Sequence, residues 1–174
     1  QLLRDGGRTK EAYELLAGGL ATQPEQSELL YESALLAEKL GRHEAMEASL
    51  RKLIRLKPEH AHAYNALGYS FAERNQRLEE AEQMVVKALQ LSPDDPFIID
   101  SMGWVLYRKG DNQGARAHLQ RAFSIRPDPE IAAHLGEVLW ALGRRDEAKR
   151  IWQEAAKAHP GNEVLAEVIK RFAP

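Results

Sequence analysis

The sequence contains no cysteine, and this absence removes several kinds of chemistry at once. Disulfide frameworks, thiolate metal sites and a cysteine nucleophile are excluded. The absence does not decide whether the protein resides in an oxidising or a reducing compartment. An excess of one charge is also missing, because 24 lysines and arginines face 26 aspartates and glutamates. Binding to nucleic acid or to an anionic membrane surface depends on a concentrated positive field, so we expect neither partner.

Long hydrophobic runs are missing as well. No stretch reaches the roughly 18 apolar residues that a membrane span requires. The longest candidate, residues 96–107, is shorter and carries Asp100. The first residues have neither the basic head nor the apolar run of a signal peptide, and there is no initiator methionine. We predict no transmembrane segment in this chain and expect that any leader peptide has been removed.

Five prolines recur at a nearly constant spacing along the 174 residues. They stand at positions 24, 58, 93, 127 and 160, which are 34, 35, 34 and 33 residues apart. A period near 34 indicates a repeat protein. The other prolines fall just after a period mark or at the chain end, so the segments between lack the residue that breaks helices. Each period can therefore hold two helices.

Small residues keep the same register as the prolines. One lies in the middle of each expected first helix, where it lets a neighbouring helix approach closely. A glycine or asparagine follows seven residues later and suits the left-handed conformation that ends a helix. Apolar residues recur at three- and four-residue spacing, and no useful stretch alternates with period two, so we predict an all-α fold. The two sets are Ala34, Gly68, Gly103 and Gly136, then Gly41, Asn75, Gly110 and Gly143.

These residues resemble the tetratricopeptide repeat over essentially the whole chain. The resemblance implies a right-handed superhelical solenoid of helix-turn-helix repeats. The first full copy departs from the pattern, since Ser33 and Ala34 replace the usual Leu-Gly and Met46 replaces a small alanine. The residues that carry the resemblance are Tyr64, Leu67, Gly68, Phe71, Ala81, Ala88, Leu89 and Pro93, then Leu135, Gly136, Leu139, Gly143, Ala148, Trp152, Ala155 and Pro160.

The period divides the chain into one partial and four full repeats. Gln1 falls at the ninth place of its copy, so we expect the chain to begin inside a first helix and to belong to a longer array. Asn162 can cap a last helix that covers the final repeat. The expected units are 1–25, 26–59, 60–94, 95–128, 129–161 and the capping helix 162–174. The expected helices are 27–39, 44–57, 61–73, 78–91, 96–108, 112–125, 129–141, 145–158 and a last one to about Phe172.

Residues 95–108 and 129–140 are also similar to the C-terminal repeats of a proteobacterial family of large tetratricopeptide lipoproteins. The best-described member of that family resides in the periplasm, is anchored to the outer membrane, and is an adaptor for a carboxy-terminal processing protease that degrades cell-wall hydrolases. The resemblance implies an adaptor role, that protease as partner, and a periplasmic, outer-membrane-associated location. Without the resemblance, a cytoplasmic location is the alternative.

In stacked helical hairpins the first helix of each pair lines the concave surface. If places are counted from the first residue of that helix, the side chains at places 2, 5, 9, 12 and 13 face inward. Those twenty residues include six acids and two bases, so we expect an acidic and aromatic groove. The known clamp for a C-terminal carboxylate needs lysine at place 5, and none is present, which disfavours a binder of chaperone tails. The candidate binding residues are Tyr31, His62, Asn65, Tyr69, Phe97, Asp100, Trp104, Tyr107, Arg108, Glu137 and Trp140.

The aromatic candidates differ in how strongly they point to binding. Trp104, at place 9, is the one we expect to face the groove, because large flat side chains with a polar edge dominate binding hot spots. Tyr107 and Trp140, at place 12, are equally well explained as packing residues between first helices. The expected ligand is an extended or helical protein segment with apolar side chains and some positive charge.

Motifs for catalysis or cofactor binding are missing. Ser49 and Lys52 match one string of the penicillin-recognising enzymes without its partner strings. His60 and His62 lack further metal ligands at a suitable spacing. No glycine-rich phosphate loop occurs, so we predict no enzyme activity, metal or cofactor. The alternatives to a binding scaffold are an enzyme or its accessory domain, and a self-associating subunit of an envelope or secretion complex that stacks through the partial repeat.

Overall fold

The computed structural model describes residues 2–174, with side chains described from residue 6 onward, and this range forms ten α-helices and no strand. Every helix predicted between residues 27 and 172 is present, and its ends differ from the prediction by at most one residue. None of the described helices is long and apolar enough to cross a membrane. The helices are α1 (Leu2–Thr22), α2 (Ser27–Lys39), α3 (His43–Leu56), α4 (Ala61–Glu73), α5 (Leu78–Leu91), α6 (Pro96–Arg108), α7 (Asn112–Ile125), α8 (Pro129–Ala141), α9 (Arg145–Ala158) and α10 (Glu163–Phe172).

Local sequence explains where several helices begin. The Asp95 carboxylate accepts a hydrogen bond from the Phe97 amide at 2.9 Å, and Pro96 occupies the first helical position, where its missing N–H costs nothing. Asp128 and Pro129 repeat this arrangement at the start of α8. The predicted cap of the last helix is confirmed, because Asn162 Oδ1 accepts from the Leu165 amide at 3.0 Å.

The turns within the hairpins have the backbone conformation that the register predicted. Gly41, Gly110 and Gly143 have φ values of 69°, 92° and 80°, a left-handed region that disfavours side chains. The remaining hairpin contains one extra residue and uses Asn75 at φ 52° and Arg77 at φ 46° instead. The first helix of each pair therefore ends at a defined point, and the second returns antiparallel to it.

Close helix crossings form the core of each hairpin. A Cβ atom added to Gly136 would lie 2.0 Å from Nε1 of Trp152, and one added to Gly103 would lie 2.6 Å from Cγ of Leu119. Trp152 is fully buried, and its indole N–H donates to the Ala133 carbonyl oxygen at 3.3 Å. The small residues in the middle of the first helices thus admit the second helices, as predicted.

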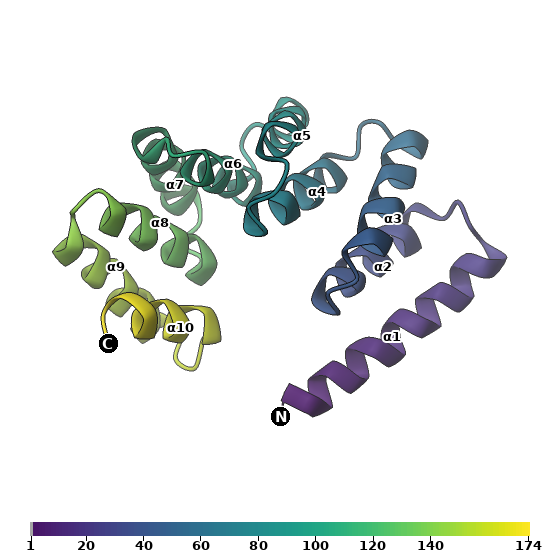
Figure 1. The fold of residues 1–174 in the computed structure, drawn as a ribbon, viewed down its shortest axis with the longest axis horizontal. Coiled ribbons are helices and arrows are strands. Elements are labelled where there is room, and N and C mark those ends of the chain that lie inside the picture. Colours follow the sequence, from purple (N-terminus) through teal and green to yellow (C-terminus); the bar gives the residue numbers. More distant parts are fainter. Residues whose placement is uncertain (1) are drawn as a thin grey trace.

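The repeats stack into an arc (Figure 1). The first helices α2, α4, α6 and α8 pack directly against one another in sequence, and α10 packs on α8 and α9. In the described part of the chain no two second helices, α3, α5, α7 or α9, make such backbone contacts with each other. Because the first helices lie closer together than the second ones, the arc bends with its first helices on the concave side.

The N-terminal segment differs from the predicted partial repeat in one respect. Gly7 occupies the register of the helix-ending glycines, yet α1 continues through Gly6 and Gly7 without a positive φ. Among the described helices α1 packs only on α2, so no first helix of its own repeat is present to fix a turn there. Once a helix exists, each further residue adds one backbone hydrogen bond, although glycine gains less from this than other residues. The division of residues 1–25 as a truncated repeat remains a prediction.

The crossing at Gly136 leads to a stability prediction. Alanine favours a helix by about 1 kcal/mol over glycine, but here its methyl group would collide with Trp152, and overpacking of a core costs about 1–3 kcal/mol. We expect Gly136→Ala to lower the urea midpoint, monitored by circular dichroism. Gly18→Ala is the control, because nothing lies within 4 Å of the added carbon and the midpoint should rise. An unchanged or raised midpoint in Gly136→Ala would contradict the packing described.

Candidate functional site

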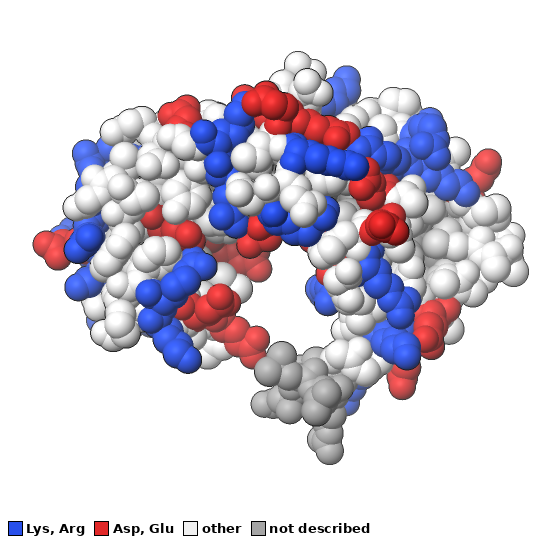
Figure 2. Space-filling model, in the orientation of Figure 1, with Lys and Arg blue, Asp and Glu red and all other residues white. Residues whose placement is uncertain are grey.

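The concave side of the arc carries a pocket of about 370 Å³ near its C-terminal end. Side chains from the three first helices α4, α6 and α8 form its wall, and α10 closes it on one side. The space-filling view shows the arc curving around a central opening, with acidic side chains along part of the rim (Figure 2). The pocket is lined by Tyr69, Glu73, Trp104, Arg108, Glu130, Ala133, His134, Glu137, Val164, Glu167, Val168 and Arg171.

A buried polar chain joins the three first helices beneath this pocket. His134 Nδ1 lies 2.9 Å and 3.1 Å from the two carboxylate oxygens of Asp100, which accept its hydrogen bond. On its other edge, Nε2 lies 3.3 Å from the hydroxyl of Tyr69. Asp100 is 6% exposed and His134 is 9% exposed. These hydrogen-bonded side chains therefore link α4, α6 and α8, and Asp100 and His134 have lost most of their contact with water.

Trp104 requires a correction to the expectation that it offers its ring to the groove. Although Trp104 lines the pocket, only 3% of it is exposed. The His134 ring stacks on it at 4.2 Å, the Tyr107 ring lies 5.1 Å away, and the Arg108 guanidinium lies 5.2 Å over it. Close packing of α6 against α8 covers place 9 from both sides, so Trp104 is part of the wall. Asp100 was likewise expected at the groove surface and is buried under His134.

Charged groups are crowded around the pocket. Glu137 accepts hydrogen bonds from Arg171 at 2.7 Å and from the Tyr107 hydroxyl at 3.5 Å. Burial nevertheless raises the pKa of Glu137, against the opposing effect of Arg171. Burial also raises the pKa of Glu130, and the charges of Asp128 and Asp100 add to this. These carboxylates therefore sit in surroundings that compensate their charge incompletely.

At the floor of the pocket, the surroundings favour the charged form of His134, whereas they disfavour the charged forms of Glu130 and Glu137. Burial by itself would lower the pKa of His134, because a charged imidazolium loses its water. The adjacent Asp100 carboxylate, with Glu73 and Glu130, overcomes this and leaves the pKa of His134 above its ordinary value. The neighbouring Tyr69 is pushed well above its ordinary pKa by burial, so its hydroxyl stays neutral.

Other predicted binding residues lie outside the pocket. Tyr31 and Asn65 are half-buried on α2 and α4, and His62 is exposed with Nε2 3.5 Å from an oxygen of Asp95. Phe97 is 38% exposed, and the Arg126 guanidinium lies 5.4 Å over its ring. Tyr31, His62 and Asn65 belong to α2 and α4, and Phe97 lies in the first turn of α6.

Trp140 occupies a different environment from the other candidates. Its ring lies 5.9 Å from those of Trp152 and Phe172, and Arg145 lies 5.0 Å over it. It therefore packs where α8, α9 and α10 meet, which agrees with the packing alternative given above for place 12. Tyr107 is half-buried beside Trp104 and Glu137. Of the predicted residues, the structure brings Tyr69, Trp104, Arg108 and Glu137 into the pocket lining.

Sequence reasoning missed the contributions of His134 and of α10. His134 follows a predicted groove place by one residue, and only the helix contact with α6 turns it toward Asp100. Val164, Glu167, Val168 and Arg171 come from a helix that was expected merely to cover the last repeat. The acids in the first part of α10 and the bases in its last turn were visible in the sequence, but nothing in them indicated that α10 contributes side chains to a pocket.

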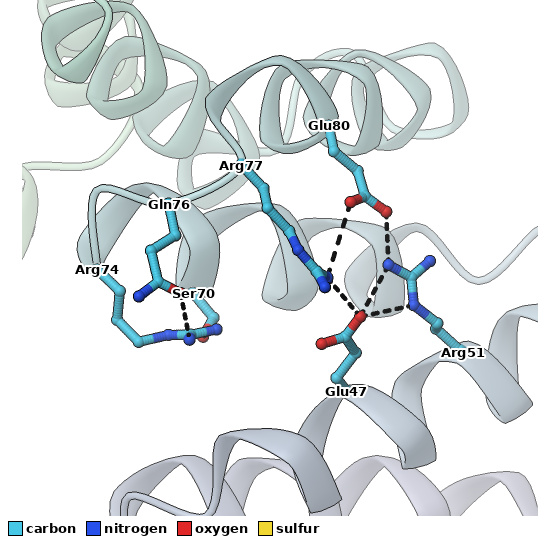
Figure 3. A network of polar contacts seen from close by, with 7 residues as sticks. All are labelled: Glu47, Arg51, Ser70, Arg74, Gln76, Arg77 and Glu80. Atoms are coloured by element: carbon cyan, nitrogen blue, oxygen red, sulfur yellow. Dashed lines mark hydrogen bonds and ion pairs between the residues drawn. The ribbon is translucent and has the colours of Figure 1, made fainter.

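The second helices carry charges that are paired with one another. Arg77 Nη1 lies 2.7 Å from Glu47 Oε1, and Arg51 Nε donates to the same oxygen at 2.9 Å (Figure 3). Arg51 also pairs with Glu80, so the network joins α3 to the start of α5. These side chains bridge second helices whose backbones do not touch. We interpret the network as structural rather than as a binding site.

Antiparallel helix pairs that repeat every 33–35 residues, with first helices on the inside of an arc, define a helical-repeat solenoid. Sequence models of the tetratricopeptide repeat match residues 27–60, 47–96 and 106–170. The chain is a tetratricopeptide repeat protein, and the predicted resemblance to that repeat is confirmed.

Known proteins share this sequence and fold to different extents. The chain is 44% identical over 137 residues, 79% of its length, to the TPR repeat-containing protein PA4667 of Pseudomonas aeruginosa, and spans 23% of that protein. The crystal structure of TTC0263, a thermophilic TPR protein of Thermus thermophilus, matches with a TM-score of 0.83 and 25% identity. The match covers 99% of this chain and 92% of the TTC0263 chain. YrrB, a TPR protein with an unusual peptide-binding site, matches with a TM-score of 0.64 and 22% identity. The match covers 91% of this chain and 84% of the YrrB chain.

The buried histidine gives a prediction with a definite sign. Because the pKa of His134 is higher in the folded than in the unfolded chain, its protonation stabilises the fold below about pH 6.5, and this stabilisation is lost as the pH rises through the raised value. Asp100→Asn keeps a hydrogen-bond acceptor but removes the charge. We expect it to lower the pKa of His134 in an NMR titration of the imidazole ring and to flatten the pH dependence of the urea midpoint above pH 6.5.

The matched control is Asp146→Asn, which removes one carboxylate from the exposed surface of α9. It should leave the titration of His134 as in the original chain. A His134 pKa that does not respond to Asp100→Asn would show that the ion pair is not what keeps the imidazole charged.

Proposed function

We propose that the chain is a scaffold that holds a segment of another protein along its concave surface. Tetratricopeptide repeat regions are generally protein–protein interaction scaffolds and are typically non-catalytic. The observation that carries the proposal is the open concave face, where side chains from successive first helices and from α10 form one pocket. The unusual peptide-binding site of YrrB supports a peptide-like ligand on this fold.

The chemistry of the concave surface indicates what the bound segment presents. Phe97 and Val164 expose apolar side chains at 38% and 39%, and the pocket that Val164 helps to line is rich in carboxylates. Apolar side chains with some positive charge complement such a surface. The buried position of Trp104 means that the acidic side chains, more than the aromatic ones, select the segment.

The partner that we propose is a periplasmic carboxy-terminal processing protease or one of its substrates, with this chain as part of the adaptor. The similarity of residues 95–108 and 129–140 to the tetratricopeptide lipoproteins supports this. In this adaptor role the chain acts in the periplasm, at the outer membrane. The chain spans 23% of the Pseudomonas relative that it matches.

Site-specific photo-crosslinking tests the groove. A photoreactive amino acid replaces either Tyr31 or Asn65 on the concave side, or Val86 or Glu154 on second helices, in the protein incubated with extract or with a purified protease of this class. We expect the same protein to be captured from both concave positions and from neither control position, because the segment lies on the concave side and does not contact the second helices. Capture from the control positions alone, or an equal capture from all four, would contradict the proposal.

A second candidate function is self-association through α1. Its outer face exposes Leu15 at 78%, and among the described helices α1 packs only on α2. Every other second helix also packs on the first helix of its own repeat, so a helix of a second copy can occupy the corresponding face of α1.

Light scattering across a concentration series tests self-association. We expect the apparent mass to rise with concentration in the original chain and to stay monomeric in Leu15→Glu, because the charge would be buried without a partner. Lys10→Glu, an exposed change on the same helix, is the control. A strictly monomeric original chain would eliminate this second candidate.

A further inference from the structure

We propose that the pocket between α4, α6, α8 and α10 binds one lysine or arginine side chain of the protein segment that lies in the groove. This inference rests on the proposed function, which supplies the segment, and adds where it is anchored and by which chemistry. The occupant is chosen by charge complementarity, by the way in which the resident cations are already engaged, and by the size and lining of the cavity.

The charge around the pocket is negative even when the buried histidine carries a proton. Five carboxylates face two guanidinium groups and one imidazolium. Three of the carboxylates line the cavity without an ion pair to any arginine, lysine or histidine in the described part of the chain. The carboxylates are Glu73, Asp100, Glu130, Glu137 and Glu167, and the three without an ion pair are Glu73, Glu130 and Glu167.

The resident cations are held in other contacts. Arg171 pairs with Glu137 at 2.7 Å, and His134 pairs with Asp100 at 2.9 Å. Arg108 donates to the carbonyl oxygen of Glu73 at 2.9 Å rather than to its carboxylate, and its guanidinium lies over the Trp104 ring. None of these cations contacts the carboxylate of Glu130 or Glu167. An additional cation therefore has carboxylate partners available inside the pocket.

The network between the second helices shows how the same fold treats carboxylates that it keeps for itself. Glu47 and Glu80 have side chains that are 24% and 32% exposed, and each contacts both Arg51 and Arg77 (Figure 3). Partly buried carboxylates are thus fully paired on that side of the arc. The pocket differs in two ways: Glu73, Glu130 and Glu167 are more exposed than Glu47 and Glu80, and the carboxylates around the pocket outnumber its cations.

The electrostatic environment agrees with a missing positive charge. Burial and neighbouring carboxylates raise the pKa of Glu130, so ionising this group costs free energy in the unbound protein. A cation within about 4–6 Å would favour the ionised form and relieve this cost. Binding of the cation is therefore expected to release protons in weakly acidic solution and to tighten as the pH rises through the raised pKa of Glu130.

The cavity suits a long cationic side chain. Its volume of about 370 Å³ lies at the lower end of the range for small-ligand pockets, about 300–1,000 Å³. Ala133, Val164 and Val168 provide apolar lining for a methylene stem, while the carboxylates receive its charged head. Among the described residues no three histidine, aspartate or glutamate side chains are placed to hold a metal ion. An organic cation with a stem fits this lining better than a metal ion does.

The experiment uses N-acetyl-arginine amide and N-acetyl-lysine amide as probes, with N-acetyl-glutamine amide as the uncharged control. NMR follows the indole N–H signal of Trp104, assigned with Trp104→Phe, and the ring signals of His134. We expect saturable shifts with at least one cationic probe and none with the glutamine probe. Linear, unsaturable shifts with both cationic probes would overturn the inference.

The variant pair Glu130→Gln with Glu167→Gln tests the assignment to this pocket. It should weaken binding of the cationic probe about tenfold or more, because two charge-assisted contacts are removed. The control pair, Glu44→Gln with Glu154→Gln, makes the same change in net charge on exposed parts of α3 and α9 and should bind like the original chain. Equal weakening by both pairs, or by neither, would overturn the inference.

Photo-crosslinking and probe binding, both measured on the original chain, separate this inference from the proposed function. If photo-crosslinking from Tyr31 and Asn65 occurs while no cationic probe binds, the groove proposal stands and the pocket inference is wrong. If crosslinking from the concave positions is absent in the original chain, the groove proposal fails first, and saturable probe binding would then show only a cation site without a protein segment. Circular dichroism of each variant confirms that the fold is intact before binding is compared.

Discussion

The structure depends on the close crossing of two antiparallel helices at a residue with almost no side chain. At Gly136 the indole of Trp152 occupies the space where any Cβ would be, and Gly68 and Gly103 admit Val85 and Leu119 in the same way. Dense contact at these points contributes dispersion and apolar burial that a larger residue would prevent. Each hairpin is thereby fixed as a unit, and the array can only stack such units.

Stacking then creates a surface that no single repeat contains. The first helices contact one another directly, and the second helices are spanned by long paired side chains such as Arg51 and Glu80. The resulting curvature directs α4, α6 and α8 toward a common space, and α10 closes one side of it. The pocket is therefore a consequence of how tightly the two layers of helices pack, and changes in that packing alter its shape.

Polar groups buried at the repeat junctions link the shape of the groove to its charge. His134 is stacked on Trp104 and hydrogen-bonded to Asp100, so its position is fixed by two side chains of α6. Buried charges are stable only when they are paired and hydrogen-bonded, and His134 and Asp100 satisfy that condition at the floor of the pocket. Above it, Glu137 pairs with Arg171, whereas Glu73, Glu130 and Glu167 have no ion pair among the described residues, and these three are the partners that we propose for a cationic side chain.

The sequence by itself determined the helices from α2 to α10, the cap at Asn162 and the turns at Gly41 and Gly110, because each of these follows from neighbours within a few residues. It also determined the repeat period, because the same pattern of residues recurs along the chain. Only the tertiary structure decided that Trp104 is covered, that His134 reaches Asp100, and that α10 contributes Glu167 to the pocket. Exposure at a groove place depends on how closely the adjacent repeat approaches and on which long side chains lie over it. Those are contacts between residues about 30 or more positions apart, and the repeat pattern places a residue on the correct face without stating what covers it.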